Sequence, residues 1–341
     1  MVHLRIVAAP EHFDAALDAL DSCPTVINVI VLRGAAHKPD GDVILCDVPR
    51  EDASVVIEDL KALGIHREGS IALELVDTAV SDAADVAVER AEGLPSDAVV
   101  WEEVTAHTSE SASLSAAFLI FMVLAAWIAA VGIFLDSAIL VVGAMVVGPE
   151  FGPIAGFCVA AVHRRADLAA RSFAALAVGF PLAIGAVLLA SEIFKATGLT
   201  PESFSAADHS LARTIASPDF FAAFVAFCAG VAGMLSLTTA KSGALIGVLI
   251  SVTTIPAAAN VGVAAAYADW AGFRGSLEQL AINIAALLVA GTLTLVVQRA
   301  VYRRRRAAHA RRRAGHAHVT RMSEHGDEPP RRAGRRGAGV G

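Results

Sequence analysis

The chain has 341 residues, of which 55% are hydrophobic and only 18% charged, and its mean hydropathy is +0.60. Its formal net charge of −7 conceals three unlike segments: residues 1–113 carry −15, residues 114–298 carry −2 and residues 299–341 carry +10. This pattern excludes a uniform globular protein, a disulfide-stabilised secreted domain and a general nucleic-acid binder. It predicts an acidic soluble segment, an apolar middle and a basic tail.

Residues 1–79, which we call the head, alternate between strand-like and helix-like periodicity. The predicted strands are His3–Ala8, Val26–Leu32, Val43–Val48 and Ile71–Val76, and the predicted helices are Glu11–Leu20 and Glu51–Leu63. The order β-α-β-β-α-β predicts a ferredoxin-like α+β domain, an antiparallel sheet with both helices on one face. Residues 80–113, which include a helical stretch at Asp82–Ala91, are predicted to form a linker.

Residues 114–302 are apolar enough to form a bundle of about six transmembrane helices. A bilayer core about 30 Å thick takes roughly 20 helical residues. Six such segments follow one another, near residues 114–135, 137–162, 171–194, 220–240, 243–268 and 277–301. Basic residues concentrate in alternate loops and in the tail, and no signal peptide is recognised at the N-terminus. We therefore expect a multi-pass protein of the bacterial inner membrane with both termini in the cytoplasm.

A weak internal repeat relates the two halves of the apolar segment. Adding 103 to the residue numbers carries the first three predicted spans onto the last three, and Pro153 then falls on Pro256. Three spans in each unit would give the units opposite orientations, which is the 3+3 inverted-repeat plan of many secondary transporters. Coincidence among alanine-rich helices is the alternative explanation.

Prolines interrupt the second and the fifth predicted spans. Gly148-Pro149 and Gly152-Pro153 lie four residues apart, and because proline removes a backbone donor and clashes with the preceding turn, they predict a helix broken into two halves. Irregular backbone at this depth is tolerated only where it is buried in protein or lines a cavity. The two breaks therefore predict a solute- or ion-binding site near the membrane midplane. Its residues are Gly148, Pro149, Glu150, Gly152, Pro153, Thr253, Thr254, Pro256 and Asn260.

Glu150 is the only carboxylate deep inside a predicted span. A charged side chain at a helix centre costs roughly 2.5 to 3.5 kcal/mol on insertion scales, so Glu150 is expected to face the bundle interior. Two interpretations remain open. Glu150 is either a proton- or cation-binding group, or a carboxyl group that locks the broken helix through a hydrogen bond to Thr253, Thr254 or Asn260.

Two stretches around these breaks carry a family resemblance. Val141–Ile154, which reads VVGAMVVGPEFGPI, and Pro256–Gly262, which reads PAAANVG, resemble the signatures of a bacterial membrane protein family known as domain of unknown function 389. The resemblance covers about residues 114–300. It implies a polytopic helical fold and no particular activity.

The leading hypothesis is a transporter or channel for a small solute or ion, with the head as a regulatory or dimerisation module. The alternative is a membrane-anchored sensor or scaffold that acts through the head. No span carries a paired nucleophile and base or a His/Glu metal set, so we predict no enzyme activity, catalytic residue, metal site or cofactor.

The tail, residues 303–341, is rich in Arg, Gly and Ala without periodicity and is predicted to be disordered. Its arginines lie close to the expected inner leaflet and favour anionic lipid. The expected partners are therefore the bilayer, anionic lipid at the tail and the transported solute, with a homo-oligomer as a further option. Nucleic acid is not an expected partner.

Overall fold

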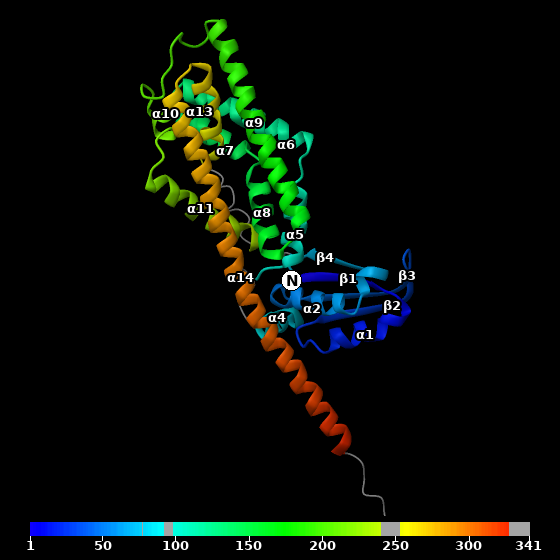
Figure 1. The fold of residues 1–341 in the computed structure, drawn as a ribbon. Helices are drawn as coiled ribbons and strands as arrows, with labels where there is room; N and C mark the ends of the chain where they lie inside the picture. The colour runs from blue at the N-terminus through cyan, green and yellow to red at the C-terminus, as the bar shows by residue number, and fades with distance from the viewer. Residues whose placement is uncertain (77, 92–97, 240–252, 327–341) are drawn as a thin grey trace, which may run out of the picture.

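The computed structural model describes residues 1–76, 78–91, 98–239 and 253–326, with side chains to residue 304. A small α+β head lies at one end of a stack of helices (Figure 1). One long helix, α14 (Trp270–Gly326), runs through the stack and continues past the head. We call the opposite end of the stack, away from the head, the far end.

The head is built on a four-stranded antiparallel sheet in the order β2-β3-β1-β4. The strands are β1 (Val2–Ala8), β2 (Ile27–His37), β3 (Asp40–Val48) and β4 (Ser70–Leu75). The helices are α1 (Pro10–Asp21), α2 (Arg50–Ala62) and the single turn α3 (Ile65–Glu68). The predicted β-α-β-β-α-β order is confirmed, with α3 added before β4.

Alternate residues of β1 supply one side of the head core. Val2, Leu4 and Ile6 are fully buried, together with Phe13 of α1 and Leu60 of α2. Period-2 alternation on the strand and 3.6-period spacing on the helices bring these side chains to one layer, as the sequence pattern predicts. The burial of this apolar set holds the helices on the sheet.

Residues 80–113 are predicted as a linker, and their described part contains two helices, α4 (Asp82–Arg90) and α5 (Trp101–Ser111). Helix α5 packs against the bundle, and Trp101 and Val104 are buried in a cluster that also contains residues of the membrane segment. Part of the expected linker is therefore a packed element that joins the head to the bundle.

In the described part of the apolar segment, four helices are long and apolar enough to cross a membrane: α6 (Ala116–Phe134), α9 (Ala166–Ala196), α11 (Phe220–Thr238) and the first part of α14. Large apolar side chains on their outer surfaces are exposed, for example Ile120 and Phe121, which suits a lipid environment. A short helix, α10 (Ser210–Ile215), lies in the connection before α11.

A fifth crossing is formed if α7 (Ala138–Val147) and α8 (Phe151–His163) are taken as one span, bent by 49° at the break between them. The break predicted at the Gly-Pro pairs is therefore observed. The predicted span near 243–268 is represented by the 13-residue helix α13 (Thr254–Ala266), and its first part falls in residues 240–252, outside the described residues. Within the described residues the structure supports four or five crossings rather than six.

Helices α6 and α9 of the first half of the bundle run in the opposite direction to α11 and α14 of the second half (Figure 1). Helices α6 and α9 lead away from the head, because Phe134 near the end of α6 and Lys195 near the end of α9 both contact the ring of Tyr267 at the far end. Helices α11 and α14 lead back, since Thr238 at the end of α11 bonds Gln298, which lies on the head side of α14.

The basic tail differs from its prediction. Disorder is predicted for residues 303–341, but α14 continues as a helix to Gly326, so the prediction is wrong for residues 303–326. Ala and Arg predominate in this stretch and are among the strongest helix formers, so the preceding helix propagates through it. The remainder of the predicted tail, residues 327–341, lies outside the described residues.

Candidate functional site

The predicted midplane site is centred on two helix N-termini that meet inside the bundle. Helix α7 ends at Val147 and α8 begins at Phe151, with Glu150 at the N-cap position. Helix α13 begins at Thr254, with Thr253 at its N-cap. From this meeting point α8 leads to the head, where the rings of His163 and Trp101 lie 5.2 Å apart, and α13 leads to the far end.

A hydrogen bond between side chains joins the two N-termini. The hydroxyl of Thr254 donates to Oε1 of Glu150 at 2.6 Å. Only 3% of Glu150 and none of Thr254 is exposed, and Oε2 of Glu150 has no hydrogen-bond partner among the described residues. Of the three partners considered from the sequence, the structure selects Thr254. A buried carboxyl group with one unsatisfied oxygen needs a proton or a cation beside it.

A second series of hydrogen-bonded side chains starts one residue away from Thr254, at Thr253. Its hydroxyl accepts from Nδ2 of Asn283 at 2.7 Å, and Oδ1 of Asn283 accepts from Nε2 of Gln279 at 2.8 Å. Both residues are on α14 and were not among the predicted site residues. A buried polar side chain on a mostly apolar helix was the available signal for both, because such groups must find partners inside the bundle.

Asn260 belongs to a separate contact. Its Nδ2 donates to the hydroxyl of Ser276 at 2.7 Å and approaches the carbonyl of Ala212 at 3.4 Å. It therefore ties α13 to α14 and α10 rather than to Glu150. Pro256 is buried in the first turn of α13, where a proline needs no intrahelical donor.

The remaining predicted residues pack around the break in α7 and α8. At Gly148 a side-chain carbon would fall on the Glu150 carboxylate and 2.7 Å from Cγ1 of Ile255, so glycine is what allows the carboxylate to fold against α13. Pro149 and Gly152 line a cavity of about 350 Å³ beside α5 and α6. Pro153 is buried in the first turn of α8. The break therefore combines one polar contact with close apolar packing.

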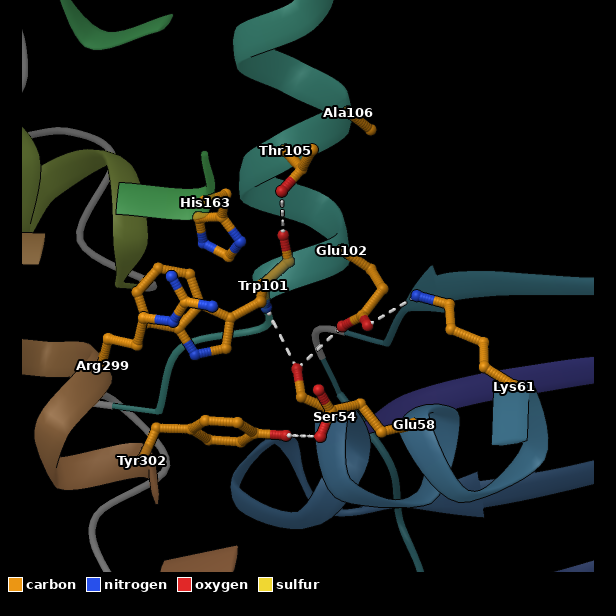
Figure 2. Close-up of a pocket in the computed structure, with 10 residues that line it drawn as sticks. All are labelled: Ser54, Glu58, Lys61, Trp101, Glu102, Thr105, Ala106, His163, Arg299 and Tyr302. Atoms are coloured by element: carbon orange, nitrogen blue, oxygen red, sulfur yellow. Dashed lines mark hydrogen bonds and ion pairs between the residues drawn. The ribbon is translucent and has the colours of Figure 1, made fainter. Parts of the chain in front are cut away.

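A second cavity, of about 430 Å³, lies between the head and the bundle, and we call it the junction cavity (Figure 2). It was not anticipated from the sequence. Its walls come from α2, α5, the end of α8 and α14, and the lining residues are Ser54, Glu58, Lys61, Trp101, Glu102, Thr105, Ala106, His163, Arg299 and Tyr302. Trp101 in a supposed linker and Arg299 at the end of an apolar run were the available signals.

Two further polar features lie outside the bundle interior. At the far end, Asp136 accepts from the backbone N–H of Leu211 at 2.9 Å and from the hydroxyl of Ser210 at 2.7 Å. These hydrogen bonds hold the pKa of Asp136 below its usual range. In the head, ligand atoms of Glu11, His12 and Glu68 lie within 4.8 Å of one another, the one group of this kind among the described residues.

Comparison with known proteins gives a family match for part of the apolar segment. Residues 145–289 match the model of a family described as domain of unknown function (DUF389), and this range contains both helix breaks. An uncharacterized protein of Methanocaldococcus jannaschii is 24% identical over 196 residues, which is 56% of this chain and 58% of that protein. The alignment thus spans less than two thirds of the relative's length. No solved structure matches the chain. The resemblance predicted from the sequence is confirmed.

Proposed function

We propose that this chain, whose residues 145–289 carry the DUF389 family match, is a membrane transporter or channel for a small solute or ion. Its site would be the meeting point of α8 and α13, where the two units of an inverted repeat would contact each other. The observation that carries the proposal is the hydrogen bond from Thr254 to the buried, half-satisfied carboxyl group of Glu150. Both termini would then lie on the cytoplasmic side of a bacterial inner membrane.

Helix boundaries support an inverted repeat. Helices α6 and α11 have 19 residues each and begin 104 positions apart, and α8 and α13 have 13 residues each and begin 103 positions apart. Helix α9 and α14 begin 104 positions apart. Helix α8 packs on α9 and α14, and its counterpart α13 packs on α14 and α9. A pseudo-two-fold axis that exchanges the two units produces this pattern of contacts.

The same repeat explains why the site lies where it does. Under the offset of 103, Glu150 corresponds to Thr253, and these residues are the N-caps of α8 and α13. Glu150 bonds to Thr254, the residue that follows its equivalent, so the corresponding helix ends of the two units meet. The half-helices begin there, and their N-termini carry partial positive charge. These ends repel a free cation, so a proton or cation that enters must bind on Glu150 itself, whose buried Oε2 has no hydrogen-bond partner among the described residues.

A flux measurement with the purified full-length protein in proteoliposomes tests this proposal. A pH-sensitive dye inside the vesicles reports proton movement under an imposed potassium diffusion potential, with and without candidate ions or solutes outside. We expect Glu150→Gln to abolish the flux, because the amide cannot release a proton or hold a cation. Glu192→Gln changes an exposed carboxylate on α9 and is the matched control.

Comparing the flux of the two variants shows whether Glu150 itself is needed for transport. Loss of flux in Glu150→Gln with full flux in Glu192→Gln supports the proposal. Equal flux in both variants, in a preparation where the wild type conducts, removes Glu150 from the mechanism. A wild type that conducts no tested solute or ion, while deletion of its gene still produces a phenotype rescued by Glu150→Gln, contradicts transport through this site.

One observation favours the alternative, a membrane-anchored sensor acting through the head. The head is fastened to the bundle, since Tyr302 of α14 donates to Oε2 of Glu58 at 3.1 Å and α5 packs against α8. A sensor of this kind would lose its signal in Tyr302→Phe, which breaks that bond, and keep it in Glu150→Gln. A transporter would show the reverse order of sensitivity.

A further inference from the structure

The two carboxylates that line the junction cavity, those of Glu58 and Glu102, both accept hydrogen bonds from other side chains of the protein. Glu102 accepts from Nζ of Lys61 at 2.9 Å and from the hydroxyl of Ser54 at 2.8 Å, and Glu58 accepts from the hydroxyl of Tyr302 at 3.1 Å. Figure 2 shows these bonds along the side of the cavity formed by the head. The acidic side chains are therefore already occupied within the protein.

The nitrogen atoms on the other side of the cavity are not occupied in this way. The Nε1–H of Trp101 and the ring nitrogen Nε2 of His163 are buried without a hydrogen-bond partner among the described residues. Arg299 donates through Nη1 to the carbonyl of Val162 in the last turn of α8, and no carboxylate of the described residues lies within ion-pair distance of it. Figure 2 shows Arg299, Trp101 and His163 grouped together.

An unpartnered indole N–H beside a guanidinium that has no carboxylate partner favours an anionic ligand rich in acceptor oxygens. A cation in a partly buried site is costly without a counter-charge. The planar guanidinium group of arginine can donate two parallel hydrogen bonds to the oxygens of one phosphate group. An indole N–H can donate a hydrogen bond but cannot accept one. We propose that the junction cavity binds a phosphate group, held by Arg299 and Trp101 with Lys61 at its rim.

The place and size of the cavity agree with this ligand. Its volume of about 430 Å³ falls within the range of about 300 to 1,000 Å³ that is usual for small-molecule sites. Trp101 and Tyr302 lie where the apolar part of α14 gives way to Arg303 and Arg304, the level at which aromatic residues meet lipid headgroups. The phosphate comes either from a phospholipid headgroup or from a soluble phosphate compound.

Such a ligand would bridge the head and the bundle, because Lys61 belongs to α2 whereas Arg299 belongs to α14. Its binding would therefore stabilise the docked position of the head. The site lies away from Glu150, and the proposal holds whether or not the bundle transports a solute.

Calorimetric titration of the full-length protein in detergent tests the site with three probes: dihexanoyl phosphatidic acid, inorganic phosphate and phosphate-free dihexanoylglycerol. We expect binding of a phosphate probe and none of the glyceride. Arg299→Gln should weaken binding about tenfold or more, as loss of a charge-assisted hydrogen bond does. Arg304→Gln, an exposed arginine further along α14, is the matched control and should change affinity by less than about twofold.

The probes distinguish the two sources. Inorganic phosphate that displaces the lipid at similar concentration indicates a soluble ligand, whereas saturation by phosphatidic acid alone indicates a headgroup. Absence of binding by both phosphate probes overturns the proposal. Equal weakening in Arg299→Gln and Arg304→Gln also overturns it, because the attraction is then a general property of the basic helix.

Arg299→Gln removes the bond to Val162 and can impair folding, so a second variant keeps the test decisive. Trp101→Phe retains an aromatic ring in the same buried place and deletes the unpartnered N–H. With a circular dichroism spectrum like that of the wild type, it should bind the phosphate probe several-fold more weakly. Wild-type affinity in Trp101→Phe together with a folded Arg299→Gln that also binds normally contradicts the site.

Discussion

Replacing Thr254 by valine tests how firmly the two half-helices are joined. The hydroxyl of Thr254 lies 2.6 Å from Oε1 of Glu150, and Oε2 already has no partner among the described residues. Valine keeps the branched shape and removes the side-chain hydrogen-bond partner that the carboxyl group has among the described residues. An unsatisfied buried acceptor costs about 1–3 kcal/mol, so we expect the free energy of unfolding to fall by about 2 kcal/mol.

A double variant provides the internal control. Replacing both partners of a buried hydrogen bond by apolar groups of similar shape is close to neutral, so Glu150→Leu combined with Thr254→Val should recover most of the loss. The coupling energy between the two positions should then exceed about 1 kcal/mol. The measurement is the free energy of unfolding in mixed micelles, followed by circular dichroism as denaturing detergent is added.

Two results would refute this reasoning. One is Thr254→Val with the stability of the wild type, and the other is a double variant that loses the sum of the single effects. The same pair also separates the two interpretations of Glu150. A double variant that is stable and still conducts in proteoliposomes makes Glu150 a structural lock, whereas a stable variant without flux makes it the ion-binding group.

Three further predictions concern other parts of the chain. Gly262→Ala places a carbon 2.7 Å from the carbonyl of Ile184 on α9, and should cost about 1–3 kcal/mol in unfolding free energy. Gly143→Ala meets nothing within 4 Å and should instead stabilise by about 0.5–1 kcal/mol; equal stabilities would contradict the close packing of α13 on α9. Because hydrogen bonds lower the pKa of Asp136 in the fold, its stabilising contribution is complete above its unfolded pKa, about 3.9, and is lost as pH falls through the lower folded value. The thermal midpoints of the wild type and Asp136→Asn should therefore converge on acidification, and a gap that stays constant down to about pH 2 would refute this. Burial raises the pKa of Cys46 to about 12, so maleimide at neutral pH should label this thiol only after denaturation, as mass spectrometry of native and unfolded samples can check.

Much of the architecture follows from local chemistry along the chain. Uninterrupted apolar runs long enough for a bilayer predict α6, α9 and α11, because a helix satisfies its own backbone groups wherever it lies. The Gly-Pro pairs at residues 148–153 predict the break between α7 and α8 for an equally local reason, the missing backbone donor of proline. Strand alternation likewise predicts the order of elements in the head.

The contacts that make sites were decided by the tertiary structure alone. Thr253, Thr254 and Asn260 were equivalent candidates for Glu150 in the sequence, and only the crossing of α8 and α13 selects Thr254. Trp101 and Arg299 are 198 positions apart, and no periodicity could bring them to one cavity. Periodicity reports the face of an element that is buried, whereas the partner it meets depends on how distant elements pack, which each stretch of sequence leaves open.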